Sequence, residues 1–109
     1  MDDCIFCQIK NGKIPSEIIF QNEDFFVVKD IAPKAPIHFL IIPKKHIASL
    51  LELKEEDGKV MADILLYTKQ LAKDNKLSER GYRLMVNTGP EGGQEVMHLH
   101  FHFLGGKKL

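Results

Sequence analysis

The chain has little of what marks a secreted, membrane-bound or nucleic-acid-binding protein. It has no tryptophan and only two cysteines in 109 residues, and its 15 basic and 15 acidic side chains cancel. A neutral chain gives no indication of a nucleic acid or an anionic membrane as a bulk partner. No apolar run approaches the ~20 residues of a membrane span. The acidic start Met1-Asp2-Asp3-Cys4 differs from the basic start of a signal peptide. We therefore expect a cytoplasmic protein that binds neither nucleic acid nor membranes.

The common phosphate-binding motifs are missing too. Neither Gly-x-x-x-x-Gly-Lys-Ser/Thr nor Gly-x-Gly-x-x-Gly occurs, so a bound phosphate is not held by a P-loop or a Rossmann turn. The chain also lacks internal repeats, low-complexity segments and linkers, and its length suits one domain over residues 1–109. A domain of this size buries a modest core, so oligomerisation or a metal ion would help to stabilise it.

Hydrophobic periodicity predicts five strands and one long helix. Apolar runs bounded by turn residues indicate strands at 17–21, 25–30, 38–42, 82–88 and 96–104, with the first two forming a hairpin. In the helix at 55–75, Val60, Ile64 and Leu71 recur on one face, which indicates core or a dimer interface. Strands with one long helix predict an α+β fold.

The most informative stretch is Gly92 to Gly106, in which three histidines alternate with apolar residues. In a strand, His98, His100 and His102 would share one face, while Leu99, Phe101 and Phe103 would face the core. One histidine on a strand is usually only hydrogen-bonded, but three in register point to chemistry. They could bind a catalytic metal ion or act as nucleophile and acid–base groups, and their spacing does not separate these possibilities.

Cys4 and Cys7 form a Cys-x-x-Cys pair. Such a pair in a cytosolic protein more often serves metal binding or redox chemistry than a structural disulfide. The redox function needs a thioredoxin-like βαβ context, which a pair starting at residue 4 lacks. A closed zinc site needs two more ligands, and His46 and His98 are the candidates. The alternative is a pair of buried free thiols.

The segment Gly-Gly-Gln-Glu-Val-Met-His-Leu-His-Phe-His-Phe-Leu-Gly-Gly closely resembles the signature of the histidine-triad (HIT) family, Hint-like branch. The resemblance covers almost the whole chain. It implies a five-stranded antiparallel sheet with one long helix and a short N-terminal helix, dimerised into a ten-stranded sheet. It also implies a purine nucleoside phosphoramidase-like hydrolase that transfers a nucleotidyl group to the middle histidine and then hydrolyses it.

The resemblance assigns roles to individual residues. His100 corresponds to the nucleophile, and His102 and His38 to its catalytic neighbours, with no cofactor needed for catalysis. The set Cys4, Cys7, His46 and His98 would hold a structural zinc ion. A zinc-bound His98 could not also carry protons, so we place it with the metal.

The same resemblance predicts a site for a purine nucleotide. Asp30 matches the position that accepts the ribose hydroxyls. Glu95 is left out of the catalytic set because a carboxylate would repel the phosphate. The remaining nucleotide-binding residues are the apolar walls around the base and the donors to phosphate oxygens: Ile5, Phe6, Ile9, Ile31, Asn87, Gly93 and Gln94.

Three functional hypotheses remain open at this point. The first is a hydrolase that cleaves at the α-phosphate of nucleoside phosphoramidates or related nucleotides. The second is a nucleotide-binding interaction or regulatory module with little turnover. The third is a metalloenzyme that uses the triad as ligands, which is disfavoured because Cys4, Cys7 and His46 offer a metal ion a better site.

Overall fold

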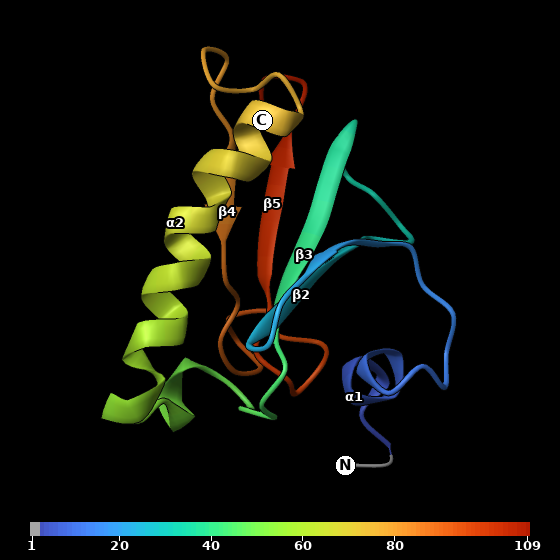
Figure 1. Cartoon of the computed structure of the whole chain (residues 1–109), viewed down its shortest axis with the longest axis vertical. Helices are drawn as coiled ribbons and strands as arrows, with labels where there is room; N and C mark the ends of the chain where they lie inside the picture. Colours follow the sequence, from blue (N-terminus) through green and yellow to red (C-terminus); the bar gives the residue numbers. More distant parts are fainter. Residues whose placement is uncertain (1–2) are drawn as a thin grey trace.

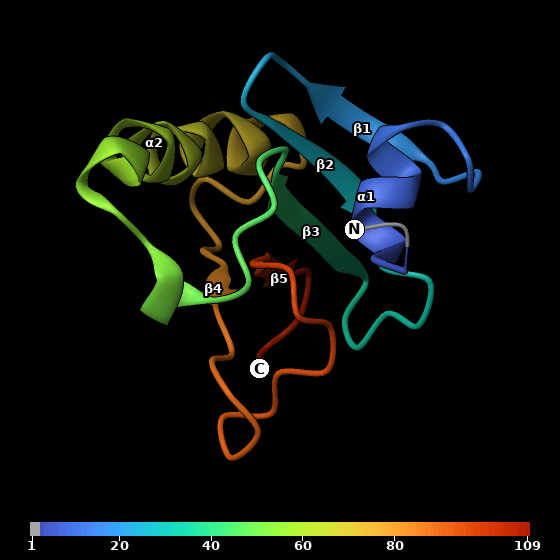
Figure 2. The same ribbon diagram turned by 90° about the horizontal axis from the view of Figure 1, so that it is seen from below.

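The computed structural model describes residues 3–109 and has one antiparallel sheet between two helices (Figures 1 and 2). The helices are α1 (Ile5–Lys10) and α2 (Gly58–Asp74). The five strands lie in the order β1-β2-β3-β5-β4. Their bounds are Ile18–Gln21 (β1), Phe25–Lys29 (β2), Ile37–Pro43 (β3), Arg83–Met85 (β4) and Phe101–Gly105 (β5). The predicted α+β fold, a five-stranded antiparallel sheet with one long helix and a short N-terminal helix, is confirmed. Within residues 3–109, no helix combines the length and apolar character needed to cross a membrane.

The middle of the sheet is its most apolar part. β3 pairs with β2 on one side and β5 on the other, with Ile41 opposite both Val27 and Phe101. Ile41 and Val27 are completely buried. Strands covered on both faces need continuous apolar runs, which these segments have. β1 and β2 form the predicted antiparallel hairpin, with a break in register between Ile18 and Phe20.

The two faces of the sheet carry separate apolar clusters. On one face, α2 contributes Ile64 and Leu71 to a core that also holds Phe101 and Phe103. On the other face, α1 packs on β2 and β3 (Figure 2). This second cluster consists of Cys4, Phe6, Cys7, Ile9, Phe26, Val28, Leu40 and Ile42. The face with α1 is the face that the histidines of the triad share.

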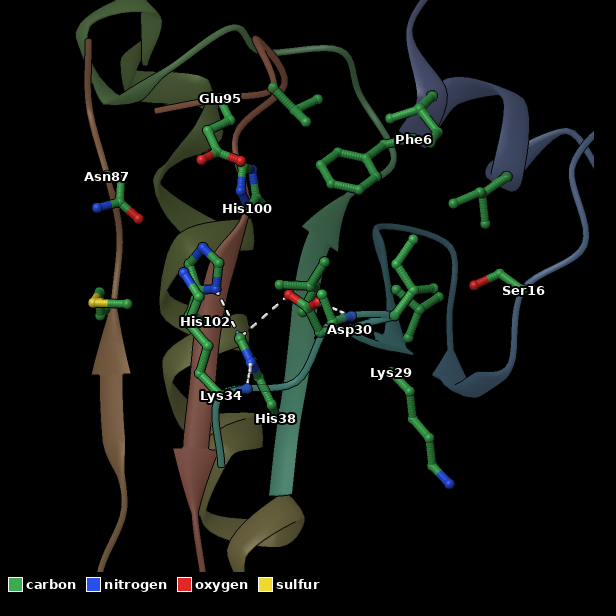
Figure 3. A pocket seen from close by; sticks show the side chains of 18 of the residues that line it. Phe6, Ser16, Lys29, Asp30, Lys34, His38, Asn87, Glu95, His100 and His102 are labelled. Atoms are coloured by element: carbon green, nitrogen blue, oxygen red, sulfur yellow. Dashed lines mark hydrogen bonds and ion pairs between the residues drawn. The ribbon is translucent and has the colours of Figure 1, made fainter. Parts of the chain in front are cut away.

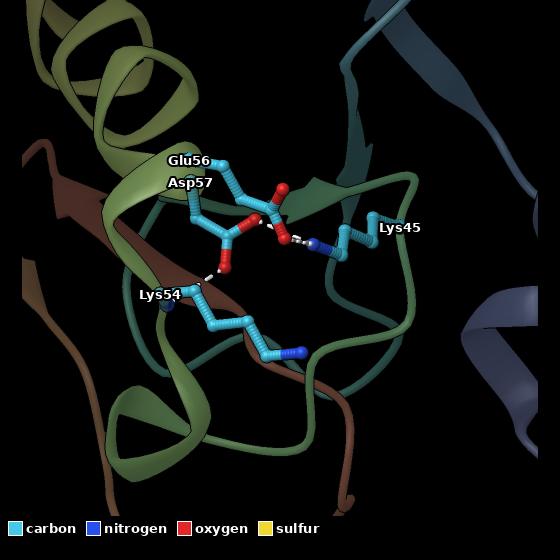
Figure 4. A network of polar contacts seen from close by, with 4 residues as sticks. All are labelled: Lys45, Lys54, Glu56 and Asp57. Atoms are coloured by element: carbon cyan, nitrogen blue, oxygen red, sulfur yellow. Dashed lines mark hydrogen bonds and ion pairs between the residues drawn. The ribbon is translucent and has the colours of Figure 1, made fainter.

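The helix predicted at 55–75 is present, with its first turn in 3₁₀ form (Glu55–Asp57). The buried Asp57 carboxylate accepts the Lys54 N–H at 2.9 Å and the Lys45 ammonium at 2.8 Å (Figure 4). These bonds tie the start of α2 to the loop after β3. At the other end Asn75 caps α2 by donating its side-chain N–H to the Leu71 carbonyl.

The strand that carries the triad is shorter than the predicted 96–104. β5 begins at Phe101, so His98 lies in a bend and His100 in the irregular segment that leads into the strand. The backbone of this segment bonds to the loop after β3, with Leu99 N–H donating to the Ile47 carbonyl at 2.6 Å. Leu99 therefore bonds outside the sheet, and the strand begins two residues later. The alternation survives, because Leu99 and Phe103 are buried against α2. β4 likewise ends at Met85 and does not extend to residue 88.

Candidate active site

A cavity of about 460 Å³ opens on the α1 face of the sheet (Figure 3). This volume lies within the ~300–1,000 Å³ typical of small-molecule sites. All the predicted catalytic and nucleotide-binding residues line it except Gln94. The cavity is also lined by residues that the sequence interpretation missed: Ser16, Lys29, Ala32, Lys34, Leu40, Met85 and Val96. No local pattern marks them, because the path of loops and strands alone brings them there.

The two ring nitrogens of His100 have different surroundings. Nδ1 lies 2.8 Å from the backbone carbonyl oxygen of His98. A carbonyl only accepts, so Nδ1 must carry the proton and donate it. In the neutral ring, Nε2 then has a free lone pair. His100 is 8% exposed and lines the cavity, so this lone pair is the available nucleophile.

A chain of hydrogen bonds fixes the other two histidines of the cavity. The Lys34 backbone N–H donates to His38 Nδ1 at 3.1 Å, so the proton of His38 is on Nε2. That Nε2–H donates to His102 Nδ1 at 3.0 Å, with an Asp30 oxygen 3.4 Å away. His102 therefore carries its proton on Nε2, where it can be donated to a ligand.

Burial keeps both of these rings neutral. It lowers the pKa of His38, against the raising effect of Asp30. It also lowers the pKa of His102 to about 4, assisted by the neighbouring His100 and His38. Because burial disfavours the charged imidazolium, these histidines act at neutral pH as hydrogen-bonding groups and not as cations.

Asp30, His38 and His102 lie close enough together to be considered as a metal site, their potential ligand atoms all lying within 4.8 Å of one another. The hydrogen bond from Lys34 argues against this use, because it leaves His38 Nε2 protonated. A metal ion binds only an unprotonated ring nitrogen. The cluster of Asp30, His38 and His102 is therefore poorly arranged as a metal centre.

A second cluster, made of Cys4, Cys7, His46 and His98, suits a metal ion well. His98 Nδ1 lies 3.3 Å from Cys4 Sγ, 3.6 Å from Cys7 Sγ and 3.1 Å from His46 Nδ1. Tetrahedral zinc with bonds of about 2.0–2.3 Å separates its ligand atoms by about 3.3–3.7 Å. His98 Nε2 donates to the Pro43 carbonyl at 2.8 Å, which leaves Nδ1 unprotonated.

The cysteines of this cluster are buried free thiols. Burial and the neighbouring Cys4 raise the pKa of Cys7, so the thiolate form needs a nearby cation. The cluster of two thiols and two imidazoles could therefore bind a metal such as zinc. All four of its members were predicted from the sequence as metal ligands.

The predicted nucleotide-binding residues differ in how they meet the cavity. Phe6 is buried, with its ring edge-on to His100 at 5.0 Å between centroids. Ile31 is 95% exposed at the rim. Asp30 Oδ1 accepts the Ala32 N–H at 2.8 Å, and Oδ2 faces His38. Ile5 and Ile9 complete the apolar wall that α1 provides.

Two of the predicted phosphate donors are already engaged. The Gln94 amide donates to the carbonyls of Ala48 and Val96 and accepts the Gly89 N–H. Gln94 thus holds the loop in place and does not line the cavity. The Gly93 N–H donates to the Pro90 carbonyl at 3.1 Å and is therefore not a donor to a ligand. This glycine has a φ of 81° and lines the cavity without a side chain.

Of the predicted phosphate donors, Asn87 has a side-chain N–H left for a ligand. Its side-chain amide donates one N–H to the Gly92 carbonyl at 2.8 Å, and its second N–H is not engaged in this bond. At Gly92, a Cβ would overlap the carbonyl oxygen of Thr88, so only glycine fits the turn that brings this carbonyl to Asn87.

Comparison with known proteins supports the resemblance to the HIT family that the sequence showed. Residues 3–108 match the family described as "Scavenger mRNA decapping enzyme C-term binding". The chain is 44% identical over 108 residues to an uncharacterized HIT-like protein of Synechococcus elongatus, covering 99% of this chain and 94% of the relative.

Solved structures with the same fold include three informative relatives. A HIT family hydrolase from Legionella pneumophila has a TM-score of 0.94 and 46% identity, covering 97% of this chain and 95% of that one. A histidine triad protein from Clostridium difficile has a TM-score of 0.95 and 40% identity, with coverage of 100% and 95%. The histidine triad nucleotide-binding protein of Candida albicans has a TM-score of 0.84 and 38% identity, with coverage of 93% and 73%.

The sheet order and the histidine-lined cavity thus define an α+β protein with a HIT-like fold. The agreement of sequence and structure over almost the full length then shows that the chain belongs to the HIT family. The Hint-like resemblance seen in the sequence agrees with the likeness to the Candida protein.

Proposed function

We propose that this chain is a HIT-family hydrolase that cleaves at the α-phosphate of purine nucleoside 5′-phosphoramidates or related nucleotides. The observation that supports this proposal most directly is the hydrogen bond from His100 Nδ1–H to the His98 carbonyl, which leaves Nε2 free in the cavity. In the first step, the Nε2–P bond forms and the P–N bond breaks, and the leaving amine takes its proton through His102 Nε2. In the second, water attacks phosphorus and gives up a proton to the same ring, and the nucleotidyl–histidine bond breaks to release the nucleoside monophosphate.

The neighbouring residues support these steps. The His98 carbonyl stabilises the positive charge that develops on His100 during attack. His102 carries its proton on Nε2, from which it can reach a phosphate oxygen or the leaving amine. Asp30 offers a carboxylate at the cavity edge for the ribose hydroxyls, and Phe6 an apolar surface for the base. Asn87 adds a donor for a non-bridging oxygen.

The direct test is incubation with adenosine 5′-phosphoramidate, following the release of AMP and ammonia. We expect turnover and, after acid-free quenching, a nucleotidyl adduct detected by mass spectrometry on the peptide that contains His100. Binding of the substrate without any release would contradict the hydrolase.

That outcome would favour the second candidate, a nucleotide-binding interaction or regulatory module with little turnover. This candidate is retained because the Candida relative is described as a nucleotide-binding protein. The same cavity contacts serve both functions, so only the rate of turnover separates them.

We also propose that Cys4, Cys7, His46 and His98 hold one structural zinc ion. Four protein ligands complete a tetrahedral shell and leave no position for a catalytic water. When bound, the zinc ion keeps the thiols deprotonated and links the α1 segment to the loop after β3. Metal analysis of the purified chain tests the site. About one zinc per chain is expected, whereas a metal-free protein with two freely titratable thiols would contradict the proposal.

Finally, we propose a two-fold symmetric homodimer formed through α2 and β4, joining two sheets into one of ten strands. β4 is an edge strand, which offers unpaired backbone groups to a second copy. On α2, Leu65 is 52% and Leu66 63% exposed, an apolar surface that a partner would cover.

A further inference from the structure

The metal cluster and the nucleophile share one residue, His98. Its side chain belongs to the cluster through Nδ1, and its backbone carbonyl accepts the Nδ1–H of His100 at 2.8 Å. Its other ring nitrogen donates to Pro43 O at 2.8 Å. His98 is completely buried. The orientation of this one residue therefore sets both the metal ligand and the acceptor that fixes the proton of His100.

The cluster and the cavity also share helix α1. Cys4 caps the start of α1, its Sγ accepting the Cys7 N–H at 3.4 Å. Between and beyond these cysteines, Ile5, Phe6 and Ile9 line the cavity. The Phe6 ring lies edge-on to both His98 and His100, at 5.8 and 5.0 Å between centroids. One side of α1 thus contacts the cluster and the other the proposed base site.

Such a short helix depends on its tertiary contacts. α1 has six residues, and isolated helices below about 12–15 residues are marginal in water. In the cluster, His98 Nδ1 and His46 Nδ1 lie 3.1 Å apart beside two buried thiols. A cation held by these four side chains would make four bonds and so order α1 and His98 together.

We propose that the cluster of Cys4, Cys7, His46 and His98 is coupled to the nucleotide site, so that a bound divalent cation increases nucleotide affinity. His98 is the positioning residue through which the cluster holds the His100 ring, and α1 transmits the same ordering to the base wall. Linkage requires the converse, that a bound nucleotide increases cation affinity by the same factor. This inference rests on the proposed zinc and nucleotide sites.

The test is a two-way binding experiment on the full chain. AMP is titrated calorimetrically into the zinc-loaded protein and into protein stripped with a chelator. We expect AMP to bind about fivefold or more weakly after stripping, within the usual range of site-to-site coupling. In the converse arm, zinc affinity is measured by competition with a chromophoric chelator, with and without saturating AMP. The two factors should agree.

A matched pair of variants separates coupling from direct contact. His46→Asn removes a ligand that lies outside the cavity lining. It should weaken AMP binding at low zinc and recover it at saturating zinc. Lys44→Ala, two residues away and outside the cluster, should behave as wild type. The ¹⁵N signals of His100 should show the single Nδ1–H form in the loaded protein and a mixture after stripping.

Each outcome leads to a different conclusion. Equal AMP affinity with and without zinc, together with zinc affinity that AMP does not change, would overturn the coupling and leave both sites intact. Failure to bind zinc would overturn the metal site and the coupling with it. Failure to bind AMP would overturn the proposed function. In that case, ¹⁵N signals of His100 that do not change when zinc is removed would overturn the coupling too. If the stripped chain unfolds, the zinc-affinity arm on loaded protein decides the matter.

Discussion

At the scale of single residues, the two ring nitrogens of His100 have different surroundings. One ring nitrogen is tied to the His98 carbonyl and the other is left free in a cavity. We predict that His100→Ala lowers turnover of adenosine 5′-phosphoramidate to below about a thousandth of the wild-type rate, since the nucleophile is lost. The fold should persist, because a smaller side chain at the cavity wall leaves the α2 core untouched. A covalent adduct on His102 would show that the wrong triad member was chosen.

Glu95 gives a second prediction at the residue scale. Its exposed side chain lies beside His100 in the cavity lining (Figure 3), and no hydrogen bond or ion pair engages it within residues 3–109. A free carboxylate repels a bound phosphate by about 1 kcal/mol at this degree of exposure. Glu95→Gln should therefore bind AMP about fivefold more tightly at low salt, with a smaller gain at high salt.

The control for this change is Glu91→Gln, which alters the same charge in the same loop outside the cavity lining. Calorimetric titration with AMP at two ionic strengths compares the two variants. Equal effects of both would mean that the net charge of the loop, and not the position of Glu95, sets the affinity.

The low pKa of His102 gives a pH-dependent prediction. Burial lowers this pKa from 6.5 to about 4. The unfolded chain therefore binds more protons than the folded chain between pH 6.5 and about 4, so stability falls as pH falls through this window. Above pH 6.5 the contribution is fully retained. Urea unfolding at pH 7.5, 5.5 and 4.5 should show a steeper loss in wild type than in His102→Asn. NMR titration should find His102 neutral at pH 5.

At the scale of elements, α2 has a buried face and an exposed face. Ile64 is completely buried in the core, whereas Lys69 is exposed on the same helix. Ile64→Ala should lower the free energy of unfolding by about 2–5 kcal/mol, because it removes buried methyl groups and leaves a cavity. Lys69→Ala should change it by less than about 0.5 kcal/mol. Denaturant titration measures both, and similar values would contradict the assigned faces.

Element boundaries were predicted less well than the elements themselves. The period of 3.6 residues placed α2 correctly, and the period of two placed Leu99, Phe101 and Phe103 in the core. The sequence did not reveal that His98 and His100 precede β5. Between them, the Leu99 N–H donates to the Ile47 carbonyl in the loop after β3, about 50 positions earlier in the chain, and no local pattern encodes that pairing.

At the scale of the whole molecule, the proposed dimer is the main prediction. Replacing Leu66 by Asp puts a charge on the exposed apolar surface of α2. Sedimentation at micromolar concentration should find a dimer for wild type and a monomer for this variant, since an unpaired charge opposes burial. Lys13→Asp, on the opposite face of the sheet after α1, serves as the control and should remain dimeric. A monomeric wild type would contradict the proposal.

The sequence by itself indicated the family, the α+β fold and most of the residues that meet at both sites, because the motif from Gly92 to Gly106 is contiguous and the hydrophobic periods are clear. Only the tertiary structure decided how those residues are used. It assigned the protons of His38 and His100 through nearby backbone groups, Lys34 N–H and the His98 carbonyl, and the proton of His102 through His38, which is distant in sequence. It also turned the Gln94 amide towards Ala48 and left Glu95 facing the cavity. Hydrogen-bond direction depends on which groups the fold brings within about 3 Å of each other, which spacing along the chain does not specify.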